Sequence, residues 1–71
     1  MALKIEIFEE THIVKGLPVD LAWQKIAPKS IPDFSCPIYK EIDKKTWEVK
    51  GSITGNVIGK ITNISAREAS R

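Results

Sequence analysis

Hydrophobic and polar residues alternate at the start of the chain, as they do in a strand that buries one face. Leu3, Ile5 and Ile7 fall on one side, and charged residues occupy the positions between them. Two consecutive glutamates interrupt the alternation before it resumes. The pattern therefore predicts one half-buried strand over residues 3–14, with a bulge or bend at 8–10.

The stretch between Pro18 and Pro28 predicts a short amphipathic helix. The fixed φ of Pro18 suits the first turn of a helix, and Pro28 ends the helix because its ring favours extended backbone at the residue before it. Apolar residues between the two prolines share one helical face: Val19, Ala22, Trp23, Ile26 and Ala27. A tryptophan at the centre of such a face is expected to be buried against the rest of the chain.

Strand patterns return after Pro37. An irregular link, with a single helical turn at residues 31–34 whose apolar side chains tuck under the sheet edge, is expected before them. Three further strands are predicted, separated by polar turns at 43–45 and 54–56: residues 38–42, 46–53 and 57–64.

Together these elements predict an α+β fold. An antiparallel sheet of about four strands, in the order β-α-β-β-β, would pack on one short helix. Trp47, Val49 and Ile53 share one face of the third strand and should point towards the core. Residues 65–71 hold no large apolar side chain and are expected to form a flexible tail on a single domain of residues 1–64.

Composition narrows the classes of protein that fit. The chain has 71 residues and a formal net charge of +2, from 11 basic and 9 acidic residues spread along its length. This dispersed charge does not indicate a nucleic-acid partner. One cysteine excludes an intramolecular disulfide framework, and no apolar stretch reaches the length of a membrane span. A cytoplasmic protein without a cofactor is expected.

Several segments resemble the START/Bet v 1-like helix-grip (SRPBCC) superfamily. The chain is most similar to the N-terminal half of a group that comprises the G-type subunit of carbon monoxide dehydrogenase and polyketide cyclase-like proteins. Four stretches carry the resemblance: Leu17-Pro18-Val19-Asp20-Leu21-Ala22-Trp23, Ile31-Pro32-Asp33-Phe34, Ile42-Asp43-Lys44-Lys45-Thr46-Trp47-Glu48-Val49 and Gly51-Ser52-Ile53-Thr54-Gly55. Complete members add further strands and a long C-terminal helix that closes a hydrophobic cavity, so the resemblance covers a half-domain.

The resemblance implies a non-enzymatic module that binds a hydrophobic small molecule between its sheet and a covering element. Six residues are expected to line that space through apolar contact: Trp23, Ile26, Phe34, Trp47, Val49 and Ile53. For the two tryptophans, a role in the core is the more common alternative.

The other interpretation is an interaction or assembly protein. The resemblance implies that such a protein could serve as an accessory to a redox enzyme. A half-domain would leave a sheet edge and an apolar face uncovered, and a second copy could cover them. The strand at 57–64 is the expected edge, because complete family members continue their sheet from there. A homodimer is therefore predicted.

The residues that could take part in catalysis or bind a metal or phosphate also have simpler structural interpretations. His12 and Glu10 could form an acid–base pair, but no second histidine stands at metal-ligand spacing, so an exposed pair is favoured and neither catalysis nor a metal is expected. Cys36 is expected to be a small, partly buried residue at a strand start. The lysines around residues 40–50 alternate with acids, which favours a solvated surface over a phosphate site. Recurrent glycines at 51, 55 and 59 indicate close backbone approach or bending.

Overall fold

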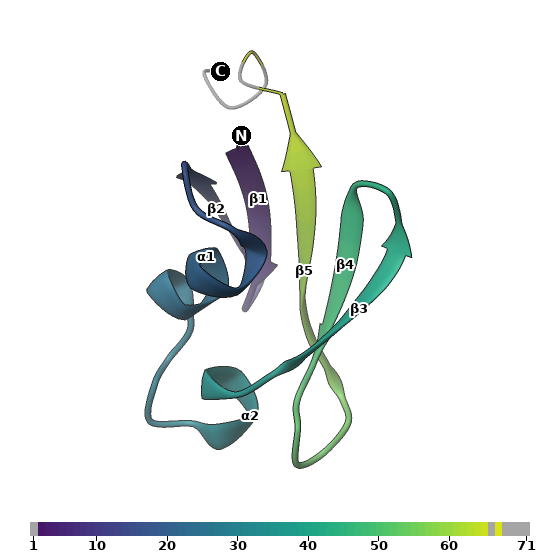
Figure 1. The fold of residues 1–71 in the computed structure, drawn as a ribbon. Coiled ribbons are helices and arrows are strands. Elements are labelled where there is room, and N and C mark those ends of the chain that lie inside the picture. The colour runs from purple at the N-terminus through teal and green to yellow at the C-terminus, as the bar shows by residue number, and fades with distance from the viewer. Residues whose placement is uncertain (1, 66, 68–71) are drawn as a thin grey trace.

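The computed structural model describes residues 2–65 and 67 and shows one antiparallel sheet with two short helices (Figure 1). The elements are β1 (Ala2–Ile7), β2 (Glu10–Lys15), α1 (Val19–Ile26), α2 (Pro32–Ser35), β3 (Ile38–Asp43), β4 (Thr46–Lys50) and β5 (Val57–Ile64). Within the described residues, the sheet has five strands in the order β2-β1-β5-β4-β3. The predicted α+β class is confirmed, with one strand more than expected.

The additional strand comes from the N-terminal segment. Instead of a single strand with a bulge, residues 2–15 form a hairpin in which Ile7 pairs with Glu10. Phe8 and Glu9 make the two-residue turn with φ of 51° and 63°. Such turns normally use Asn-Gly or Asp-Gly, because bulky residues rarely adopt positive φ. The sequence therefore carries no usual turn signal here.

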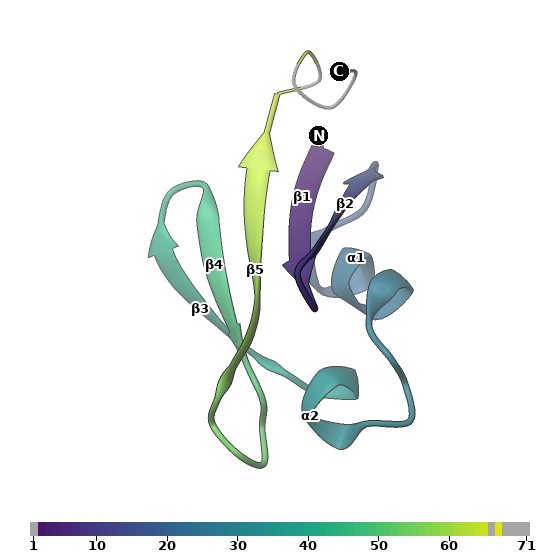
Figure 2. The ribbon, with the colours of Figure 1, turned by 180° about the vertical axis from the view of Figure 1, so that it is seen from behind.

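Helix α1 begins and ends where the prolines predict. Pro18 is the residue immediately before the helix, and Ala27 follows it with extended backbone (φ −70°, ψ 145°), as expected for a residue before proline. Trp23 has no exposed surface, which confirms its predicted burial. Figure 1 and Figure 2 show α1 on one face of the sheet, at the end formed by β1 and β2.

The link after α1 contains the predicted helical turn, α2, at residues 32–35. Phe34 packs against the core, but Ile31 remains 42% exposed, so the expectation that both residues tuck under the sheet is wrong for Ile31. Cys36 ends this turn and is exposed rather than partly buried. The turn contributes one apolar side chain to the core and leaves the thiol at the surface.

Strand β4 ends at Lys50, three residues before the predicted boundary. The following turn is closed by two backbone hydrogen bonds, from Gly51 N–H to Asn56 and from Gly55 N–H to Gly51, each 2.9 Å. Ile53 lies in this turn and is 72% exposed, so it does not share the core-facing side of Val49. The apolar–polar alternation continues past the point at which pairing stops.

Strand β5 occupies the centre of the sheet. It pairs with β1 on one side and with β4 on the other. The prediction that residues 57–64 form an available edge is therefore wrong, because the N-terminal hairpin occupies that side. The two outer strands are β2 and β3.

The core lies between α1 and one face of the sheet. Ile5 stands opposite Ile61, which in turn stands opposite Trp47. The buried apolar cluster comprises Leu3, Ile5, Ile7, Val14, Ala22, Trp23, Ala27, Val49 and Ile61. A single chain thus covers Val49 completely, although a half-domain was expected to leave it open.

The opposite face of the sheet is mainly polar. Lys4 and Glu6 approach within 3.9 Å, and Glu48 and Lys50 within 3.7 Å. The second pair confirms the mixed-charge surface predicted for the basic hairpin. Residue 65 and residue 67 apart, the expected flexible tail lies outside the described residues.

Candidate functional site

The six residues expected to line a ligand space are distributed unevenly. Trp23 and Val49 are fully buried, and Ile53 lies apart on the exposed turn. The other three are partly buried and pack against the core: Ile26, Phe34 and Trp47. Side chains from both the helix and the sheet therefore meet in the space where the ligand was expected.

The indole of Trp23 is held by a hydrogen bond and by ring stacking. Its Nε1–H donates a hydrogen bond of 2.8 Å to the Phe34 carbonyl, and its ring stacks on that of Phe34 with centroids 6.5 Å apart. Phe34 also stacks on Phe8, with centroids 4.9 Å apart. These three rings lead from the core to the surface, where Phe8 is 58% exposed.

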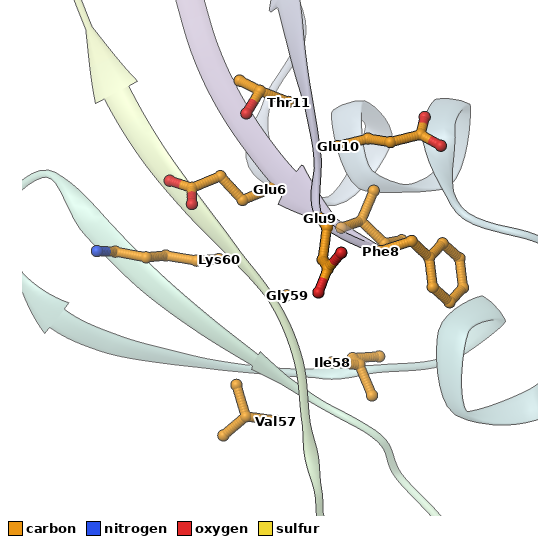
Figure 3. A pocket seen from close by; sticks show the side chains of 10 residues that line it. Glu6, Phe8, Glu9, Glu10, Thr11, Val57, Ile58, Gly59 and Lys60 are labelled. Carbon is orange, nitrogen blue, oxygen red and sulfur yellow. The ribbon is translucent and has the colours of Figure 1, made fainter.

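A pocket of about 330 Å³ opens beside Phe8, at the turn between β1 and β2 and the start of β5 (Figure 3). Its apolar lining comes from Ile7, Phe8, Val57 and Ile58. Its charged lining comes from three glutamates (Glu6, Glu9 and Glu10) and Lys60, so acidic groups predominate. The sequence pattern does not reveal this pocket, because it predicts a bend where the chain makes the turn that forms it.

The outer edge of β2 is the first of the two edges that the described strands leave unpaired. Ile13 projects from the polar face of the sheet, opposite Lys4, and is 43% exposed. Its neighbour Val14 points to the other face, where it is buried in the core. An edge strand presents unpaired backbone N–H and C=O groups that can pair with another strand.

The outer edge of β3 differs in its chemistry. Pro37 precedes the strand and Lys40 and Glu41 occupy its middle. The pairing with β4 is shifted between Glu41 and Asp43, which makes Ile42 an extra residue in a bulge. Proline, charge and bulges are the means by which native sheets discourage further pairing.

Side-chain hydrogen bonds connect α1 to β3 and to α2. Tyr39 donates a hydrogen bond of 2.8 Å to the Asp20 carboxylate on α1. Partial burial, together with this bond, raises the pKa of the Tyr39 hydroxyl. Gln24 on the same helix donates to the Ser35 carbonyl at 2.6 Å, so α1 is linked to both β3 and α2.

Asp33 connects α2 to the turn at residues 51–56. Its carboxylate accepts hydrogen bonds from the Ile53 and Thr54 backbone N–H groups, at 2.7 and 3.2 Å, and from the Thr54 hydroxyl at 2.7 Å. These bonds, led by the one from the hydroxyl, hold the pKa of the Asp33 carboxyl below its ordinary value. A Cβ at Gly51 would lie 2.5 Å from this carboxylate carbon, so the turn approaches Asp33 closely.

The side chains that could take part in catalysis or metal binding lie in different parts of the structure. His12 Nε2 lies 3.5 Å from Glu10 Oε2 on β2, which confirms the predicted pairing of the two side chains. Cys36 lies beyond α2, in a different part of the chain. Among residues 2–65 and 67, no group of three or more His, Cys, Asp or Glu side chains has the arrangement of a metal site. Neither described helix is long and apolar enough to cross a membrane.

No family model, curated protein or solved structure matches this chain. The resemblance to the helix-grip superfamily therefore stays a prediction.

Proposed function

We propose that this chain is a non-enzymatic interaction module that associates with a second copy of itself through an open edge of its sheet. The observation that carries the proposal is the β2 edge, where an isoleucine is 43% exposed on a strand that pairs with β1 alone among the described strands. Strand addition at such an edge supplies backbone hydrogen bonds without a preformed cavity. A two-fold axis lets each copy cover the other with the same surface.

Dimer formation makes the melting temperature depend on the protein concentration, because only the folded chain associates. Light scattering on samples from low to high micromolar concentration should show the mass rising from monomer to dimer, and the melting temperature should rise over the same range. A monomeric mass at high micromolar concentration, with a constant melting temperature, would contradict the proposal.

The pocket beside Phe8 favours a second candidate function, the binding of an amphiphilic small molecule. Its volume of about 330 Å³ lies at the lower end of the range for ligand sites. Apolar side chains and an excess of carboxylates in the same lining suit a ligand with a hydrocarbon part and a positive charge.

Hexylammonium and hexanoate are suitable probes, since they share a hydrocarbon chain and differ in charge. Titration with hexylammonium should shift the backbone amide resonances of Gly59 and Lys60, whereas hexanoate should leave them in place. The shifts should disappear in a Val57→Lys variant, which places a positive charge on the lining and repels the ammonium group. Equal responses to the two probes would exclude charge selection by this pocket.

A further inference from the structure

We infer that the second copy docks on β2, and that the two β2 strands pair antiparallel around Ile13. This inference rests on the proposed self-association and specifies the surface and the register. Three observations support it. They are the direction of the backbone groups on β2, the side-chain pairs in the registers centred on Ile13 and on His12, and the chemistry of the β3 edge.

The hairpin register determines which backbone groups of β2 are free. In a two-residue hairpin the residues that flank the turn, here Ile7 and Glu10, exchange hydrogen bonds, and such pairs recur at every second position. Glu10, His12 and Val14 therefore direct their backbone groups towards β1. Thr11, Ile13 and Lys15 direct theirs outward, where a new strand can pair with them.

A two-fold axis perpendicular to the sheet limits the registers that are possible. Such an axis joins the two sheets into one, with the polar faces of both copies on the same side. Residues that stand directly opposite each other must therefore lie on the same face of the sheet. An axis centred on Ile13 meets this condition. It also places the outward-directed backbone groups of one β2 opposite those of the other β2, so that the two sets can form hydrogen bonds. Ile13 then faces Ile13 of the second copy, and the exposed isoleucine becomes covered on both chains.

The remaining pairs in this register are compatible. Thr11 faces Lys15 of the second copy on the polar side of the sheet, and His12 faces Val14 on the other side. No like charges stand opposite each other, which is the arrangement that destabilises cross-strand pairs. Centring the axis on His12 instead would place the two imidazoles side by side and a glutamate opposite Val14. The Ile13 register is therefore the more favourable one.

The same test applied to β3 gives the opposite result. Its pairing with β4 leaves the backbone groups of Tyr39 and Glu41 directed outward. Centring on Lys40 or on Glu41 places like charges face to face. Centring on Ile38 or on Tyr39 places Pro37, which lacks an N–H, opposite Tyr39 or Glu41 of the second copy. Symmetric pairing is thus disfavoured on β3 and permitted on β2.

The experiment compares Ile13→Lys with Ile38→Lys. Ile13 and Ile38 are exposed by 43% and 55%, on opposite edges of the sheet, so neither change removes a core side chain. Ile13→Lys should give a folded monomer by light scattering and circular dichroism, because two ammonium groups would face each other across the axis. Ile38→Lys should keep the mass of the wild-type protein.

Suppose that the wild type is a dimer. If Ile13→Lys is also a dimer, or if Ile38→Lys is a monomer, the β2 assignment is wrong and self-association still holds. A wild-type monomer would overturn the proposed function itself. The two failures are therefore distinguishable.

Cysteine cross-linking tests the register of the two β2 strands directly, and it does so even if Ile13→Lys fails to fold. In a Cys36→Ser background, Ile13→Cys should form a disulfide-linked dimer under mild oxidation, because its Cα atoms would lie within bridging distance. His12→Cys should cross-link far less. Predominant cross-linking through His12→Cys would assign the register centred on His12 and overturn the one proposed.

Discussion

The ring of Trp23 lies directly on the backbone of Gly59. A Cβ placed on Gly59 would be 2.6 Å from Trp23 Cη2 and 2.8 Å from the Glu6 carbonyl oxygen. The central strand thus has a glycine where the largest core side chain meets it. This contact explains a glycine in the interior of a strand, where its conformational freedom is otherwise unfavourable.

Gly59→Ala should lower the free energy of unfolding by about 1–3 kcal/mol, as overpacked core substitutions do. The clash involves both a stacked indole and a backbone carbonyl, and neither can move without disturbing the sheet. Thermal or urea unfolding would measure the change, with Lys60→Ala, the exposed neighbour on the other face, as the control. An unchanged melting temperature would show that the indole can shift away.

Trp23 should contribute through its ring and through its N–H separately. Trp23→Ala removes the ring and should cost about 3–5 kcal/mol, enough to unfold a domain of this size. Trp23→Phe keeps an aromatic ring but leaves the Phe34 carbonyl without its 2.8 Å hydrogen bond. Its cost should be smaller than that of Trp23→Ala, and urea unfolding of both variants would compare them. Full stability of Trp23→Ala would contradict the core assignment.

The turn between β1 and β2 offers a stabilising change. Glu9 has a φ of 63°, a conformation that costs an L-residue roughly 1–2 kcal/mol and glycine very little. Part of that gain is offset by the greater backbone freedom of glycine in the unfolded chain, so Glu9→Gly should add about 0.5–1 kcal/mol to the free energy of unfolding. Glu10→Gly, inside β2, should instead lower the free energy of unfolding. Equal effects of both changes, measured by urea unfolding, would contradict the turn geometry.

Much of the fold could be predicted from the sequence because the apolar spacing matches the period of each element. The alternation around Ile5 and the helical face around Trp23 both lie in the core as expected. The prediction failed where backbone geometry overrides side-chain pattern. Nothing in the Phe8-Glu9 pair resembles a hairpin turn, and Ile53 continues an alternation after its strand has ended.

The candidate site was harder to predict for the same reason. With residues 3–14 predicted as one strand, the edge around Ile13 cannot be recognised, and β5 is placed at the outside. The pair of glutamates at positions 9 and 10 was the available signal, since charged residues next to a break in alternation are compatible with a turn. Strand order depends on contacts between distant segments, which spacing along the chain does not encode.

His12 should not bind a metal ion strongly. Its imidazole lies 3.5 Å from the Glu10 carboxylate, and these two groups supply fewer ligands than a stable zinc site requires. Adding zinc should therefore leave the melting temperature unchanged, both in the wild-type chain and in a His12→Ala control. A rise of several degrees that is confined to the wild type would show a site completed by groups from elsewhere, such as a second copy.

The hydrogen bonds to Asp33 should make the stability of the chain depend on pH in the acid range. Because the pKa of this carboxyl is lower in the folded chain than its ordinary value of 3.8, the folded state favours the ionised form. The stabilisation is complete above the ordinary value and is lost as the pH falls through the folded pKa. Asp33→Asn removes this titration and weakens the bonds to Thr54 and Ile53.

Melting curves of the wild type and Asp33→Asn should therefore converge as the pH falls from 5 towards 2, with the wild type more stable at pH 5. Glu41→Gln is a suitable control, because it removes an exposed carboxylate from β3, away from the turn at 51–56. It should leave the acid-dependent loss of stability close to that of the wild type. A constant difference between wild type and Asp33→Asn across this range would mean that the carboxylate does not hold the turn through its charge.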